Sequence, residues 1–222
     1  MYLLGLLRPL RLGGLNLMDL LIRAVVVLIA ISTHELAHGF MAYKLGDPTA
    51  KSMGRLSLNP LKHLDPVGAL CMLFFGFGWA KPVMINPYYF KKPKRDTALV
   101  SLAGPLSNFL LAFLGVIVLK ILTLIPAGGN AHVFIPISYI LSTFIGLNIG
   151  LGVFNLIPIP PLDGSKIFLS FLPNWLYRDI MRYEHLGWLI LVFALATNVL
   201  SPILSTLQQG VLNVLFFLVG GL

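Results

Sequence analysis

Two histidines and a glutamate stand together within a strongly apolar stretch of the sequence, His34-Glu35-Leu36-Ala37-His38. Residues four apart lie one above the other on the same face of a helix, so both imidazoles can bind the same zinc ion. Glu35 lies beside them, where its carboxylate can accept a proton from zinc-bound water without being a ligand. Ionisable groups inside a membrane span are costly and mark function, and one of the chain's two glutamates is placed here. The pattern therefore argues against a chance cluster and predicts a hydrolytic zinc site.

Asp163 is the favoured third ligand, which a catalytic zinc needs beside one open position. It lies near the end of a proline-rich segment, residues 155–164, that follows an apolar stretch. Irregular backbone at membrane depth is tolerated only where it is buried in protein or lines a wet cavity, and a carboxylate there suits a metal ion. The alternative is that Asp163 caps a helix beginning near Ser165.

The three remaining histidines are weaker candidates for that ligand. His132 lies in a glycine-rich loop and is expected to be a solvated surface residue, and His185 is expected at the membrane interface. His63 stands in an ordered polar segment, where a loop hydrogen bond is favoured over a catalytic role.

The composition shows what kind of protein must position these residues. Of 222 residues, 57% are hydrophobic and 11% charged, and the mean hydropathy is +0.88. A soluble domain carries about 25% charged residues, so this chain is expected to be a membrane protein. The net charge of +8 is attributed to basic loops on the cytoplasmic side and not to nucleic-acid binding. A single cysteine, Cys71, excludes an internal disulfide and a cysteine zinc cluster.

Apolar stretches of about 20 residues can cross a bilayer as helices. Five are expected, with a break between the last two at Ser201-Pro202: residues 17–43, 97–126, 134–157, 185–204 and 207–222. Residues 67–80 form a shorter, glycine-rich apolar run, and residues 81–87 alternate and contain prolines as in an edge strand. We therefore predict an all-α polytopic membrane protein with about five transmembrane helices and a re-entrant or membrane-embedded β-like segment between the first two. One domain, residues 1–222, is expected.

The proposed ligands constrain the topology. Asp163 must reach the two histidines, so the C-terminal ends of the first and third spans must lie on the same side of the membrane. A full crossing by residues 67–80 would place those ends on opposite sides, so a re-entrant or surface-embedded path is favoured. Twelve of the sixteen Lys and Arg residues then fall on the side of the metal site, and the positive-inside rule assigns that side to the cytoplasm.

Four motifs follow one another along the chain. After His34–His38 come an Asn-Pro, His, Asp-Pro-x-Gly segment within residues 55–68, Gly-Pro-x-x-Asn at 104–108, and Asn-x-x-Pro-x-Pro-x-x-Asp-Gly at 155–164. In these motifs the sequence resembles the site-2 protease family of intramembrane zinc metalloproteases, peptidase family M50, in its short prokaryotic form without a PDZ domain.

The resemblance implies one Zn²⁺ on His34, His38 and Asp163, with Glu35 as the general base. It also implies that Asn155 lies near the site, where its amide could bind the substrate carbonyl or the developing oxyanion. Capping or bridging a broken helix is an equal alternative for Asn155, and Asn108 is expected to mediate helix packing.

The expected activity is hydrolysis of peptide bonds within or near transmembrane segments of membrane proteins. Its partners would be transmembrane protein or peptide substrates and the lipid bilayer of the cell (inner) membrane, with the active site towards the cytoplasm. A non-proteolytic membrane metal-binding protein or scaffold is the alternative. The sequence leaves the oligomeric state and the identity of the substrate open.

Overall fold

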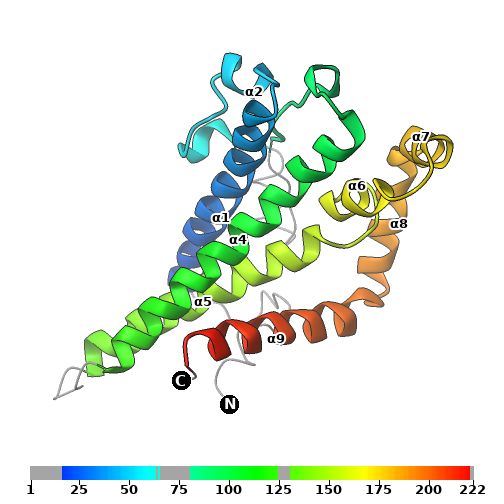
Figure 1. Cartoon of the computed structure of the whole chain (residues 1–222). Coiled ribbons are helices and arrows are strands. Elements are labelled where there is room, and N and C mark those ends of the chain that lie inside the picture. The colour runs from blue at the N-terminus through cyan, green and yellow to red at the C-terminus, as the bar shows by residue number, and fades with distance from the viewer. Residues whose placement is uncertain (1–16, 64, 66–80, 125–130, 221–222) are drawn as a thin grey trace.

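The computed structural model describes residues 17–63, 65, 81–124 and 131–220, and all regular structure within them is helical (Figure 1). The helices are α1 (Leu17–Lys44), α2 (Thr49–Ser52), α4 (Pro93–Leu124), α5 (Ala131–Asn155), α6 (Asp163–Leu169), α7 (Asn174–Arg182), α8 (Glu184–Ala196) and α9 (Leu200–Leu218), with the 3₁₀ helices η2 (Pro60–Lys62) and η3 (Pro87–Tyr89). Within these residues, four helices are long and apolar enough to cross a membrane: α1, α4, α5 from Phe134, and α9. The protein is therefore a multi-pass membrane protein, and its described regular structure is helical.

Helices α1, α4 and α5 pack side by side and position the metal ligands (Figure 1). Asn108 of α4 contacts α1 at Ala30, while Val100 contacts His38 further along α1, so these two helices are antiparallel. Helix α5 is antiparallel to α4 in turn, which makes α1 and α5 parallel. Their C-terminal ends therefore lie at the same end of the bundle, as the topology argument requires.

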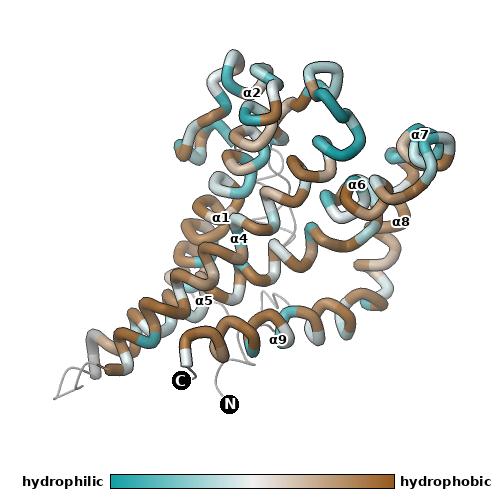
Figure 2. Tube along the Cα trace, in the orientation of Figure 1, coloured by the Kyte–Doolittle hydropathy of each residue, from teal (hydrophilic) through white to brown (hydrophobic). Residues whose placement is uncertain are grey.

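The core of the bundle lies between α4, α5 and α9. Its fully or nearly fully buried side chains are apolar and come from all three helices: Ala112, Val116, Leu119, Ile145, Ile149, Val153, Leu212 and Leu215. Many large apolar side chains on the outer faces of the same helices are exposed, as expected where lipid is the solvent. Figure 2 shows this apolar character along the long helices, whereas polar residues gather around α2, the start of α4 and α7.

The predicted helix break at Ser201-Pro202 is wrong, because the helix ends earlier. Helix α8 ends at Ala196, and Asn198 has the left-handed backbone conformation, with φ of 56°, that asparagine tolerates after a helix end. Helix α9 begins at Leu200, so Pro202 lies in its first turn. Proline is tolerated there because the first N–H groups of a helix have no partner within the helix.

The predicted fourth span, residues 185–204, is not formed as one helix. Helix α8 has 13 residues and is about 20 Å long, which falls short of the roughly 30 Å hydrocarbon core. Leu191 of α8 is buried in a second apolar cluster. The other members come from the end of α5, the start of α6 and the start of α9: Ile157, Leu162 and Leu200.

The predicted edge strand at residues 81–87 is not formed within the described part of the chain. Residues 81–86 join no sheet there, and η3 begins at Pro87. The Lys81 N–H donates to the His63 carbonyl oxygen at 2.8 Å, so residues 63 and 81 are adjacent in space. Residues 67–80, predicted to be re-entrant, lie outside the described residues.

Candidate metal centre

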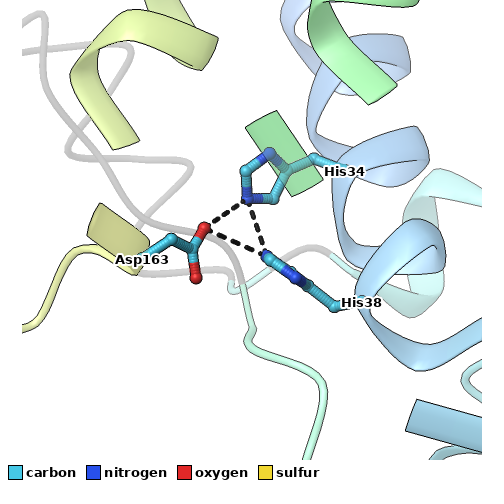
Figure 3. Close-up of side chains that lie close together, drawn as sticks. All are labelled: His34, His38 and Asp163. Carbon is cyan, nitrogen blue, oxygen red and sulfur yellow. Dashed lines mark hydrogen bonds and ion pairs between the residues drawn. The ribbon is translucent and has the colours of Figure 1, made fainter. Parts of the chain in front are cut away.

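His34, His38 and Asp163 meet in the interior of the bundle (Figure 3). The two Nε2 atoms lie 2.9 Å apart, and Asp163 Oδ2 is 3.1 Å from each of them. The histidines are one turn apart on α1, and Asp163 is the first residue of α6. Their side chains are 8–13% exposed. The structure thus brings together the three residues that sequence reasoning selected from distant parts of the chain.

Hydrogen bonds fix which nitrogen of each histidine faces the others. The His38 Nδ1–H donates to the Val100 carbonyl oxygen at 2.7 Å, and a carbonyl can only accept. Asn108 Nδ2 donates to the Ala30 carbonyl oxygen at 3.2 Å, so Asn108 Oδ1 is the atom that accepts from His34 Nδ1–H at 2.6 Å. Both Nε2 atoms therefore carry a lone pair when the rings are neutral.

Three possible electron-pair donors thus converge on one point, where a metal ion, or a proton shared in a hydrogen bond, can lie between them. Ligand atoms about 2.0–2.2 Å from a tetrahedral zinc lie about 3.3 Å apart, only a few tenths of an ångström more than the separations of 2.9–3.1 Å found here. Two imidazoles and a carboxylate also match the donor set of catalytic zinc, which leaves a fourth position open. The residues present therefore fit a zinc ion.

The Asp163 carboxylate is held in the charged form that a ligand needs. Burial alone would raise its pKa, but the charge of His38 and hydrogen bonds from both histidines outweigh that effect, so the pKa of Asp163 lies well below its usual range. Its carboxylate contacts the histidines, and the N-cap of α6 is Leu162, without a side-chain hydrogen bond. The alternative prediction, a capping role near Ser165, is therefore wrong.

Helix α4 forms the wall against which both imidazoles pack. A Cβ atom on Gly104 would lie 2.5 Å from His38 Nε2 and 2.6 Å from His34 Cε1, and real Cβ atoms do not make such short contacts. Gly104 therefore leaves the space that both metal-facing rings occupy.

Asn108 and Asn148 form a buried hydrogen-bonded chain behind His34. Asn108 Nδ2 donates to Asn148 Oδ1 at 3.1 Å, Asn148 Nδ2 donates to the Phe144 carbonyl oxygen at 2.9 Å, and both asparagines are fully buried. The predicted packing role of Asn108 is thus incomplete, since its side chain also orients a metal-facing histidine. Sequence reasoning missed Asn148, although an asparagine inside an apolar helix is a signal for such a bond.

Glu35 is half-buried beside the histidines, and its carboxylate is bound by a backbone group. The Val83 N–H donates to Glu35 Oε2 at 2.8 Å. Residues 81–86, which carry this donor, are held in place by Asp47, a fully buried residue that accepts from the Asn86 N–H at 2.7 Å. Sequence reasoning did not identify Val83 or Asp47, because neither contact follows from local spacing.

The remaining candidates lie elsewhere or outside the described side chains. Asn155 ends α5, and its Nδ2 donates to the Leu151 carbonyl oxygen at 3.0 Å, within the same helix. His63 is buried, and its Nε2 bonds the Ser57 carbonyl oxygen at 2.7 Å, the loop hydrogen bond that was predicted. The side chains of His132 and His185 lie outside the described residues.

Comparison of the sequence with known proteins shows the family of this chain. The signature of peptidase family M50 matches residues 120–198. "Putative zinc metalloprotease YwhC" of Bacillus subtilis is 39% identical over 203 residues, which cover 90% of this chain and 92% of that protein. "Zinc metalloprotease MJ0392" of Methanocaldococcus jannaschii is 28% identical over 148 residues, which cover 67% of this chain and 33% of that protein. No solved structure matches the chain. With YwhC alike along almost its whole length, the chain belongs to peptidase family M50.

Proposed function

We propose that this protein is an intramembrane zinc metalloprotease that hydrolyses peptide bonds within or near transmembrane segments of membrane proteins. The observation that carries the proposal is the convergence of His34 Nε2, His38 Nε2 and Asp163 Oδ2 beside the Glu35 carboxylate. Membership of family M50 and the names of the relatives support it. The whole chain, residues 1–222, would form one membrane domain.

In this mechanism His34, His38 and Asp163 hold one Zn²⁺. When bound, zinc lowers the pKa of water towards about 7 and polarises the scissile carbonyl. Glu35 accepts the proton of the attacking water and passes it to the leaving amine. The Val83 N–H donates to the Glu35 carboxylate and holds it in place.

The substrate would be an unwound part of a transmembrane helix, because helical backbone carbonyls are shielded by their own hydrogen bonds. Residues 81–86 supply an extended chain beside Glu35. A substrate could pair with this chain by strand addition, which would bring its peptide bonds next to the base.

Asn155 would stabilise the oxyanion in this proposal. Its amide donor is bound to the Leu151 carbonyl oxygen, so the side chain would have to turn from its own helix towards the substrate. The protein would lie in the cell (inner) membrane with the metal centre towards the cytoplasm. The reason is that basic residues concentrate on the same side of the proposed topology as the metal centre.

The function is tested by comparing purified wild-type protein with Glu35→Gln for zinc content and for cleavage of single-span substrates. Both proteins should bind about one zinc, and the variant should cleave at least about a hundredfold more slowly, as for loss of a general base. Equal cleavage would exclude Glu35 as the base. If both bind zinc and neither cleaves, a metal-binding or scaffold role replaces the protease.

The same assay defines the role of Asn155. Asn155→Ala should retain zinc and lower the turnover number if the amide serves the oxyanion. An unchanged turnover number would restrict Asn155 to the end of its helix.

A further inference from the structure

A cleft of about 540 Å³ lies between the start of α4 and helix α6. Its α4 wall changes in character along the helix, with Lys92, Lys94 and Arg95 at one end and Ala98, Leu99 and Leu102 further on. The opposite wall is formed by Ile167, Ser170 and Phe171. Phe171 is 82% exposed, so a large apolar ring borders the cleft without being covered by the described protein.

The order of charged and apolar residues gives the cleft two chemically distinct ends. Arg95, Leu99 and Leu102 are three or four residues apart and lie on one face of α4. From position 92 to position 102 the chain advances about 15 Å along the helix axis. The cationic end belongs to the polar end of the molecule, and the apolar end lies within a membrane span (Figure 2). An amphiphile with an anionic head and an apolar tail matches this pattern.

An adjoining hollow of about 470 Å³ adds further positive charge. It shares Pro93 and Lys94 with the cleft, and α7 contributes Arg178 and Tyr177 to it. The Lys94 ammonium donates to the Leu172 carbonyl oxygen and lies 5.6 Å from the centre of the Tyr177 ring. Lys94 thus links α4 to the α6–α7 connection, and the basic lining of the cleft and hollow extends from α4 to α7.

The acidic groups nearby do not cancel this charge. Asp96 is buried and binds the Lys92 N–H at 3.0 Å, and its other oxygen is 3.7 Å from Arg95 Nε. Asp179 is exposed on α7. Glu184, whose charge acts on Tyr177, is the third. Three carboxylates therefore accompany the four cationic side chains that line the cleft and hollow, Lys92, Lys94, Arg95 and Arg178.

We propose that this cleft binds an anionic phospholipid, with its headgroup at Lys92, Arg95 and Arg178 and one acyl chain along Leu99 and Leu102. Basic pockets between membrane helices recognise anionic headgroups in this way. A lipid explains the apolar end, which lies along a membrane-spanning helix, better than an acidic peptide does. The site is independent of the proposed protease activity. It also lies beside the metal centre, because the same stretch of α4 carries Val100 and α6 begins with Asp163.

The test is native mass spectrometry of the purified full-length protein with phosphatidylglycerol and with phosphatidylcholine of the same acyl chains. Wild type should retain phosphatidylglycerol preferentially. Lys92→Gln/Arg95→Gln should weaken that retention about tenfold. The matched control is Lys51→Gln/Lys62→Gln, which removes the same charge from α2 and η2 outside the cleft and should leave retention unchanged. Ala98→Phe fills the apolar end and should reduce retention without a change of charge.

Four results would overturn the proposal. Equal retention of the two lipids, or an equal loss in both double variants, would show general attraction to a basic surface. Glycerol phosphate bound as tightly as phosphatidylglycerol would show that the apolar end binds no acyl chain. An acidic peptide that binds at Lys92 and Arg95 while phosphatidylglycerol does not would assign the cleft to a polypeptide.

Discussion

At the scale of single residues, the metal centre depends on groups that are not ligands. Asn108 accepts the His34 Nδ1–H at 2.6 Å, and the Val100 carbonyl oxygen accepts the His38 Nδ1–H at 2.7 Å. Each bond leaves an Nε2 lone pair directed at the centre. Such partners raise the basicity of a ligating imidazole and hold its ring in place, so α4 contributes to metal binding without supplying a ligand.

Replacing Asn108 with leucine should therefore weaken zinc binding about 10- to 100-fold, as measured by competition with a chelator. Asn108→Asp keeps an acceptor for His34 and should lose less affinity than Asn108→Leu. Asn213→Leu is the matched control, since Asn213 is exposed on α9 and its amide oxygen accepts from Gln209. Equal affinities for wild type and Asn108→Leu would refute the orienting role.

Gly104→Ala should reduce zinc binding while all three ligands remain. The added methyl group would lie 2.5 Å from His38 Nε2, so the rings or α4 must move. Gly210→Ala makes the same change in α9, where nothing lies within 4 Å, and should be neutral or stabilising by about 0.5–1 kcal/mol. Zinc content and melting temperature of both variants provide the measurement. A Gly104→Ala protein with normal zinc affinity would contradict this packing.

The ligands were predictable at this scale, but their supports were not. Spacing along one helix places His34 and His38 together, and the need for a third ligand leads to Asp163. Gly104 and Asn108 contact the histidines only because α4 turns this face towards α1. The sequence alone does not fix that rotational orientation of α4.

At the scale of elements, the extended segment of residues 81–86 connects the loop after α1 with the base. It is held by His63 and Asp47, and its Val83 N–H contacts Glu35. In an extended chain successive N–H groups point to opposite edges, so the bonds of Lys81 and Val83 occupy one edge. Met84 and Asn86 face the other edge. The Asn86 N–H is bound to Asp47 there, and the Met84 N–H is the donor proposed to pair with substrate.

Met84→Pro removes that N–H and should slow cleavage of a single-span substrate at least about tenfold, with zinc content unchanged. A proline at position 84 favours extended backbone at the preceding residue, Val83. Met84→Ala retains the N–H and serves as the control for the side chain. Cleavage by Met84→Pro at the wild-type rate would rule out pairing at this edge.

Sequence patterns predict the boundaries of elements less accurately than their presence. The long apolar helices were predicted closely, because hydropathy over about 20 residues is a strong signal. The end of α8 was misplaced because Pro202 was interpreted as a break, whereas α8 ends at Ala196, before the left-handed Asn198, and Pro202 lies in the first turn of α9. The segment of residues 81–86 was mistaken for a strand because its residues alternate in character as in a strand. One of its edges is buried against the protein, but it joins no sheet in the described part of the chain.

At the scale of the whole molecule, polar residues gather at the end of the bundle where α2 and the start of α4 lie, and the opposite end is apolar (Figure 2). Lys62 in η2 lies at the polar end, and Thr123 lies in the last turn of α4 at the other. If the positive-inside rule holds, the polar end and the metal centre face the cytoplasm.

Orientation can be measured with single cysteines in a Cys71→Ala background. Thr123→Cys should react with a membrane-impermeant maleimide in intact cells, and Lys62→Cys should react only after permeabilisation. The opposite pattern would invert the proposed topology, and labelling of both in intact cells would place the two positions on the same side and contradict it.

The distance between the ligands along the chain has a consequence for biosynthesis. His34 and Asp163 are separated by 129 positions, so the chain between them must be synthesised after the first histidine before the third proposed ligand exists. A nascent chain that has inserted α1 and α4 holds both histidines but lacks the carboxylate that completes the donor set. The order of synthesis therefore keeps an unfinished copy inactive while it is still beside the other membrane proteins being inserted at the same site.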